Sequence, residues 1–415
     1  MEPRHLKTGE LKPIRTFLAL ATVAVLILAG WTLWQRDMDN EDENGEVSFP
    51  DVDIQYVSDI RELKALHDIP SVVVDPEEMS DIATRNLSED ELHMLQYLFE
   101  ILLLWDQGDG DLADAFDDFA RSDVAGLYVP EDRAMYVTDR FSEGLTSKVL
   151  VHEYTHALQD QHFDLSSFME GNTTDSTMAL RCLVEGDATL VADVQYYYSL
   201  SDRQRGVLME EMEDLYDGQV TNTPYALWEL MTFPYMEGLE FTIDIHQNEG
   251  WEGVDSVFLK PPLSTEQVIH PEKYRDDEAP IPAQPGVPPE GAREVSNDRM
   301  GEFMVSIFLG HHMDRDHANK GAEGWGGDQM VIYEGEDGAT LAEWSLVWDT
   351  DRDAWEFSRA MEQLVEITTD PVENPDIHSC GDFFFSWERQ GRGHSIIFAE
   401  NIRDLEDWRT VRYDG

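Results

Sequence analysis

Basic side chains are scarce in this chain of 415 residues. Lysine and arginine together number 29, and only seven of these are lysine, whereas aspartate and glutamate number 86. Proteins that bind nucleic acid or an anionic membrane surface need the opposite sign of charge. The composition therefore excludes nucleic acid as a partner.

Cysteine is scarcer still, because Cys182 and Cys380 are the only two. An extracellular location would permit a disulfide between them, and two buried thiols fit the sequence equally well. No internal repeat period is visible, which argues against a solenoid or an array. With 41% apolar and 10% aromatic residues, the composition is that of an ordinary globular protein long enough for two or three packed units.

The abundant acidic residues give a formal net charge of −57 at pH 7. Such a surface repels itself in dilute buffer, but the Debye length falls to about 3 Å at 1 M salt, so brine makes it tolerable. An acidic interaction domain would carry clustered acidic runs, whereas here the acids are scattered along the folded region. The pattern predicts a halophilic source.

An uncharged run of nineteen residues, TFLALATVAVLILAGWTLW, occupies residues 16–34. As a helix it would extend about 28 Å, close to the thickness of a bilayer core. Four basic residues precede it and acidic sequence follows, so the positive-inside rule places the N-terminus in the cytoplasm and the body outside. We expect a membrane anchor at residues 1–36 and an acidic linker at 37–46. The alternative is a cleaved signal peptide, for which Ala29 and Gly30 supply small residues.

The body begins near residue 47 and divides at a proline-rich stretch. Residues 47–278 are predicted to form a mostly helical domain with one short hairpin, made by Gly126–Val129 and Ala134–Asp139. Residues 279–297 form a linker or an extended wrap, and residues 298–415 an α+β unit. In the last unit we expect helices at 298–309 and 351–367 and strands at 330–335, 342–348, 382–390 and 394–401. The predicted fold class is α+β.

The stretch LVHEYTHALQDQH contains the arrangement H-E-x-x-H. On a helix over residues 145–161, His152 and His156 continue the apolar stripe that includes Val149, so both point toward the core. Standing one turn apart, they can offer nitrogens to one zinc ion, while Glu153, rotated by about 100°, can reach a water in the open coordination position. The motif predicts a Zn²⁺ site with Glu153 as a catalytic residue.

His162 is one candidate for the third ligand, because it lies ten residues after His152, as in the metzincin pattern. In that pattern a glycine lets the chain leave the helix, and here Gln159 stands at this position. If the helix continues, His162 faces away from the pair, at about 280° around the axis. The spacing therefore argues against His162.

Glu185 is the better candidate, because it lies within the apolar part of the next long helix, TDSTMALRCLVEGDATLVADVQYYY. A carboxylate among apolar side chains is costly unless it is paired or bound to a metal. The alternatives are a cap at a helix break at Gly186 or an ion pair with Arg181. Asp187 could orient a ligating histidine. We predict His152, His156 and Glu185 as the metal ligands.

These segments resemble a known group. VHEYTHALQDQ followed by LVEGDA looks like the zinc core of gluzincin metallopeptidases, although residues 157–184 make the gap before the glutamate longer than in thermolysin-like enzymes. The anchor and the acidic body resemble haloarchaeal surface proteins of unestablished function. YMEGLEF (235–241), PPLSTEQVIHPEKY (261–274) and GWGGDQMVIYEG (324–335) resemble segments that follow the zinc helices in related uncharacterised proteins.

The resemblance implies hydrolysis of a peptide bond by zinc-activated water. Glu153 would take the proton and return it to the leaving amine, and a further donor would stabilise the oxyanion. Tyr235, His270 and the pair His311 and His312 are candidates for that donor.

Two classes of function follow. One is an anchored extracellular zinc peptidase with a protein or peptide substrate. The other is a non-catalytic cell-surface protein that keeps the fold for structural or binding purposes.

Overall fold

A computed structural model of the chain describes residues 24–25, 48–105, 108–168, 172–220, 223–368, 372 and 374–413. Apart from Ala24 and Val25, the predicted anchor at residues 1–36 and the acidic linker at 37–46 lie outside this range. Within the described residues, no helix is both long enough and apolar enough to cross a membrane. The anchor therefore stays a prediction.

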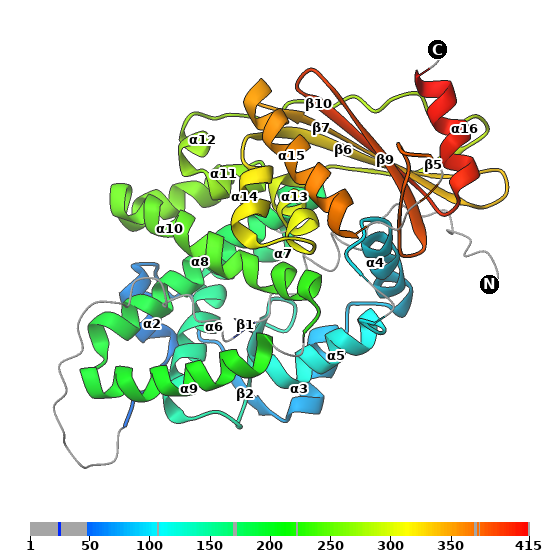
Figure 1. Ribbon diagram of the computed structural model, residues 1–415. Helices are drawn as coiled ribbons and strands as arrows, with labels where there is room; N and C mark the ends of the chain where they lie inside the picture. Colours follow the sequence, from blue (N-terminus) through cyan, green and yellow to red (C-terminus); the bar gives the residue numbers. More distant parts are fainter. Residues whose placement is uncertain are drawn as a thin grey trace.

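Helices and strands are mixed along the chain, which confirms the α+β class (Figure 1). The first part contains β1 (Ala24–Val25), α2 (Ile54–Arg61), β2 (Ser71–Val74), α3 (Pro76–Thr84), α4 (Glu89–Ile101), α5 (Leu112–Asp123), β3 (Val124–Val129), β4 (Ala134–Thr138), α6 (Glu143–Phe163), α7 (Leu165–Phe168), α8 (Thr174–Ser199), α9 (Asp202–Val220), α10 (Tyr225–Leu259), α11 (Thr265–Ile269) and α12 (Pro271–Arg275). The second part contains β5 (Arg293–Asp298), α13 (Gly301–Gly310), α14 (Arg315–Ala322), β6 (Trp325–Glu334), β7 (Thr340–Trp348), α15 (Asp351–Thr368), β8 (His378–Cys380), β9 (Phe383–Gln390), β10 (Gly393–Ala399) and α16 (Ile402–Tyr413).

The predicted hairpin is present as β3 and β4, joined by a turn at residues 130–133. It belongs to a larger sheet, because β2 pairs with β4 in parallel and β1 pairs antiparallel with β3. The sequence predicted only the hairpin, since the pairing of β2 with a distant strand leaves no local pattern. Helix α6 packs against β3 and α8 packs against both α6 and α10, so these elements form the frame of the first part (Figure 1).

The second sheet has six antiparallel strands in the order β5-β6-β7-β10-β9-β8. Its side chains alternate between two faces, as strand geometry requires. Met330 and Ile332 of β6 join the main core with α13 and α15, whereas Val331 and Tyr333 pack with α16. Both faces of this sheet are therefore covered by helices (Figure 1).

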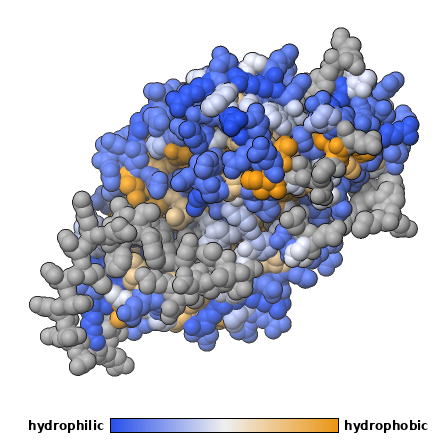
Figure 2. Space-filling model, in the orientation of Figure 1, coloured by the Kyte–Doolittle hydropathy of each residue, from blue (hydrophilic) through white to orange (hydrophobic). Residues whose placement is uncertain are grey.

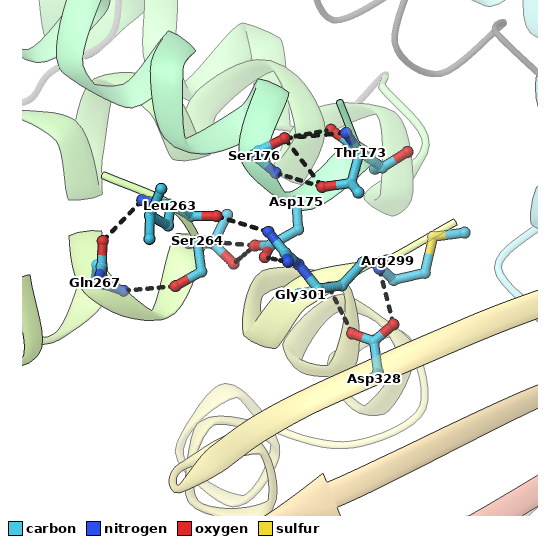
Figure 3. A network of polar contacts seen from close by, with 12 residues as sticks. Thr173, Asp175, Ser176, Leu263, Ser264, Gln267, Arg299, Gly301 and Asp328 are labelled. Carbon is cyan, nitrogen blue, oxygen red and sulfur yellow. Dashed lines mark hydrogen bonds and ion pairs between the residues drawn. The ribbon is translucent and has the colours of Figure 1, made fainter. Parts of the chain in front are cut away.

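A polar network fastens the start of α8 to the second part (Figure 3). Thr173 caps the helix, and the fully buried Asp175 accepts hydrogen bonds from the Thr265 amide and hydroxyl, both at 2.7 Å, and from Arg299 Nε at 2.8 Å. Gly301 must be glycine here, because it has a φ of 88° and an added Cβ would lie 2.1 Å from Asp175 Oδ1. The network holds the helix that carries Glu185.

The proline-rich stretch wraps along the second sheet. The Ile281 amide donates to the Gly326 carbonyl at 2.6 Å, and Trp408 Nε1 donates to the Val287 carbonyl at 2.9 Å. Residues 293–297 of the predicted linker form most of β5 instead, where they pair with β6. The largest hydrophobic cluster runs from β2 to β10, so both predicted units contribute to one core.

The visible surface is mostly hydrophilic, with only small apolar patches between polar side chains (Figure 2). Cys182 is buried and Cys380 half-buried, and the two are not joined by a disulfide. The structure thus favours the second of the two cysteine alternatives.

Candidate metal centre

Two histidines and one glutamate from adjacent helices converge in the core. His152 and His156 stand one turn apart on α6, and Glu185 comes from the middle of α8. All three are buried, with at most 7% of any residue exposed. Their ligand atoms lie close enough together to hold one metal ion. The fold therefore brings together the three residues that the sequence predicted as ligands.

The distances form a nearly equilateral triangle. His152 Nε2 lies 3.1 Å from Glu185 Oε2 and 3.0 Å from His156 Nε2, and His156 Nε2 lies 3.3 Å from Glu185 Oε2. Ligands around one tetrahedral zinc, with bonds of about 2.0 to 2.1 Å, stand about 3.3 Å apart. The other oxygen of Glu185 is buried without a hydrogen-bond partner in the described part of the chain. The donor set and its spacing fit zinc.

Gln159 determines which nitrogen of His156 faces the cluster. Its Nε2 donates to the Val184 carbonyl at 3.0 Å and to Asp187 Oδ2 at 2.9 Å, and both of these groups only accept. The amide oxygen therefore points at His156 Nδ1, 2.9 Å away, and that nitrogen must donate. A neutral His156 then presents the lone pair of Nε2 to the cluster, as a metal ligand must.

A buried ion pair continues this chain of contacts. Asp187 accepts from Arg61 Nε at 2.7 Å, with both side chains fully buried, and Arg61 also binds Asp255 at 2.7 Å. The guanidinium lies over the ring of Trp251. Asp187 thus acts on the histidine through Gln159, whereas the sequence suggested a direct contact. One sign of the role of Gln159 is visible in the sequence, since it lies on the same helical stripe as the two histidines.

The three ligand groups shift one another's pKa values. Burial lowers the pKa of His152 to about 4. Burial also disfavours a charged His156, but the Glu185 carboxylate reverses this effect and raises the pKa of His156 to about 9. Burial would raise the pKa of Glu185, yet the charge of His156 and hydrogen bonds from both imidazoles hold it below its ordinary value. The cluster therefore favours positive charge beside the carboxylate, which a metal cation also supplies.

Glu153 lies beside the cluster, between α6 and β3. It is fully buried, its Oε2 accepts from the Tyr128 amide at 2.6 Å, and its Oε1 has no hydrogen-bond partner among the described residues. Burial raises its pKa to about 8. The close approach depends on Gly126, where an added Cβ would lie 2.4 Å from Val149 Cγ1. A carboxyl group with a raised pKa and one uncommitted oxygen suits proton transfer.

Two glycines allow α8 and α10 to touch. A Cβ on Gly186 would lie 2.0 Å from the Gly238 carbonyl oxygen, and a Cβ on Gly238 would lie 2.1 Å from the Cys182 carbonyl oxygen. The helix runs through Gly186 without the break considered from the sequence. The contact brings Tyr235 of α10 over His152, with ring centroids 5.7 Å apart and nearly parallel. Of the candidates for an oxyanion donor, Tyr235 is the one against a ligand.

The competing assignments for the ligands are not found. Helix α6 continues to Phe163, so His162 is exposed and its Nε2 contacts the Lys64 carbonyl at 2.8 Å. Arg181 does not pair with Glu185, because its three side-chain nitrogens are buried without a hydrogen-bond partner in the described part of the chain.

The remaining histidine candidates contact other groups. His270 Nε2 lies 3.1 Å from Glu302 Oε1, and the rings of His311 and His312 pack edge to face. His311 also packs near Tyr225. None of these contacts involves the ligand cluster.

A second group of carboxylates is close enough for a metal ion, namely Glu266, Glu278 and Asp349. Lys273 already lies between them, with its ammonium 3.0 Å from Glu278 Oε1 and in contact with the other two. This cluster is therefore a partly buried ion-pair network.

Comparison with known proteins gives one match. Residues 289–409 match a family described as Domain of unknown function (DUF8575). This stretch contains the second sheet and its helices and lies outside the candidate metal centre. No curated protein and no solved structure matches the chain.

Proposed function

We propose that this protein is a zinc-dependent peptidase. The observation that carries the proposal is the buried triangle of His152, His156 and Glu185 with Glu153 beside it. Three protein ligands and an adjacent carboxylate are typical of catalytic zinc sites, because a structural site usually has four protein ligands and no use for a base.

The roles of the residues follow from their positions. When bound, zinc would polarise the attacking water and the scissile carbonyl. Glu153 would accept the proton of the water at Oε1, the oxygen without a partner, and pass it to the leaving amine. Tyr235, stacked on His152, is the candidate for stabilising the oxyanion.

Strand β3 is the candidate surface for an extended substrate. Along the edge away from β4 it pairs antiparallel with β1 (Ala24–Val25), and a substrate segment that replaced β1 could pair there in the same way. Its Tyr128 amide contacts Glu153, which places the proposed base beside this strand. A peptide bound to β3 would therefore lie near the ligand cluster.

We also propose where the protein acts. The apolar run at residues 16–34 would anchor it in the membrane with the body outside the cell, which requires Ala24 and Val25 to leave their pairing with β3. The net charge of −57 suits a halophilic, archaeal surface.

One observation favours a non-catalytic alternative. Glu153 and Glu185 are 0% exposed and His152 only 7%, so a substrate must displace covering groups to reach them. A surface protein that uses the metal only to join α6 and α8 would need no such opening.

The first experiment measures metal. Protein purified in molar KCl without chelator should contain about one zinc per chain. His156→Ala should lose it and His162→Ala should keep it, because His162 binds the Lys64 carbonyl outside the cluster. Wild-type protein without a stoichiometric transition metal would contradict the proposal.

The second experiment separates catalysis from metal binding. Glu153→Gln should retain zinc but hydrolyse unfolded casein at least about 100-fold more slowly, since an amide cannot take the proton. Glu143→Gln is the matched control, because Glu143 is exposed at the start of the same helix and binds only the Phe49 amide in the described structure. Equal background hydrolysis by wild type and Glu153→Gln, with zinc in both, favours the non-catalytic alternative.

A further inference from the structure

A pocket lies where the first and second parts of the chain meet. It is a pocket of about 510 Å³ lined by α10, the end of α11, α13, α14 and Arg352 of α15. A pocket of this size holds a small organic molecule, and ligand sites often occur at such junctions.

The pocket is separate from the candidate metal centre. Glu229, Phe233 and Glu237 line it at intervals of four residues along one stripe of α10. Tyr235, which stacks on His152, is two residues from Glu237 and therefore about 200° around the helix. Glu237 belongs to the segment YMEGLEF and His270 to PPLSTEQVIHPEKY. In these two segments, only Tyr235 and Gly238 have a role at the candidate metal centre.

The inner wall carries negative charge that the nearby basic groups compensate only in part. Glu302 is 3% exposed, its Oε1 lies 3.1 Å from His270 Nε2, and its Oε2 has no hydrogen-bond partner among the described residues. Burial raises the pKa of Glu237 to about 7 and that of Glu302 above its ordinary value. Keeping these carboxylates ionised therefore has a cost that a bound cation would remove.

Each of the basic residues at the pocket already pairs with a carboxylate. Arg315 lies 3.3 Å from Glu229, while Lys320 and Arg352 lie 3.4 and 3.2 Å from Glu356. They stand at the rim, where their side chains are at least 60% exposed. Glu302 has His270 as its hydrogen-bonded counter-charge, and Lys273 acts on it only through its charge.

The shape of the pocket favours an organic cation over a metal ion. Phe233 and Phe303 provide an apolar wall, with ring centroids 3.9 Å apart. In the described structure, the oxygens of Glu229, Glu237 and Glu302 are not among the sets close enough to share one metal ion. A ligand with an apolar stem and ammonium groups can contact both the rings and the separated carboxylates.

We propose that this pocket binds a small aliphatic amine, with ammonium groups at Glu302 and Glu237 and the stem against Phe233 and Phe303. The site is independent of the proposed peptidase activity, since no ligand of the candidate metal centre lines it.

The experiment is a calorimetric titration of the full chain in molar KCl with 1,5-diaminopentane, compared with 1-pentanol and pentanoate. The high salt suppresses association with the acidic surface, whereas pairs in a buried pocket are screened much less. The diamine should bind at about one per chain and raise the melting temperature. Glu302→Gln and Glu237→Gln should each weaken binding at least about tenfold, because each removes a buried partner of the ammonium.

Glu323→Gln is the matched control, since Glu323 lines the same pocket but is exposed, and its affinity should stay within about twofold of wild type. Thermal unfolding establishes that each variant is folded, and two inner variants keep the test decisive if one is not. Equal binding of 1-pentanol would overturn the proposal. So would unchanged diamine affinity in Glu302→Gln and Glu237→Gln, or many equivalent sites per chain.

Discussion

Replacing Gln159 by methionine tests whether the residues around the candidate metal centre orient its ligands. Methionine keeps the volume of the side chain but removes three contacts, to His156 Nδ1, the Val184 carbonyl and Asp187 Oδ2. Asp187 keeps Arg61, and the Val184 carbonyl lies inside a helix. His156 Nδ1 is the group that loses the acceptor on which its hydrogen bond depends.

The magnitude follows from these contacts. A buried donor left without its acceptor costs about 1 to 3 kcal/mol, and two weakened acceptors cost about 0.5 to 1.5 kcal/mol each. We therefore expect Gln159→Met to lower the free energy of unfolding by about 2 to 6 kcal/mol. Zinc affinity should fall by about 10 to 100-fold, because the tautomer and orientation of His156 are no longer held.

The assay is a competition titration of zinc against a chromophoric chelator in molar KCl. The matched control is Gln161→Met on the same helix, because Gln161 also bonds backbone groups, the Leu66 amide at 2.6 Å and the His67 carbonyl at 3.1 Å, but none at the cluster. The control should keep wild-type zinc affinity. Equal zinc affinity in both variants would refute the role of Gln159, whereas wild-type protein that binds no zinc would refute the metal centre itself.

Two further predictions concern stability. Gly186→Ala should lower the free energy of unfolding in denaturant titrations, because the added Cβ would lie 2.0 Å from the Gly238 carbonyl oxygen. Such overpacking costs about 1 to 3 kcal/mol or more and exceeds the gain of about 1 kcal/mol in helix propensity. A more stable variant would contradict the close approach. Burial, aided by the charge of Arg389, lowers the pKa of His394 to about 3, and its Nδ1 accepts from Trp348 Nε1 at 3.0 Å. The folded pKa is below the unfolded value of about 6.5, so the stability that neutral His394 contributes is fully present above pH 6.5. This stability is lost as the pH falls toward 3, by about 1.4 kcal/mol per pH unit. Between pH 6.5 and 5, the free energy of unfolding of His394→Gln should therefore fall by about 2 kcal/mol less than that of wild type. Parallel curves of unfolding free energy against pH for the two proteins would rule this out.

The local pattern of the sequence determined much of the candidate site. The stripe that includes Val149, His152 and His156 predicted a helix with both histidines inward, and α6 has this form. The absence of glycine at position 159 predicted that the helix continues and turns His162 away, as observed. The apolar neighbours of Glu185 predicted a buried carboxylate that needs a partner. These predictions succeeded because a helix fixes the direction of each side chain relative to residues three and four positions away.

Other features depend on residues far apart in the chain, and only the tertiary structure decided them. The sequence did not indicate that Arg61 would bind Asp187, that β2 would join the hairpin, or that the N-terminus of α8 would be held by Arg299. Gly186 suggested a possible helix break until α10 was seen to pass 2.0 Å from its missing Cβ. The pocket proposed to bind an amine likewise needs α10, α13 and α14 together. Such contacts are set by how amphipathic elements pack around a shared core, and the periodicity within one element does not record which partner it will meet.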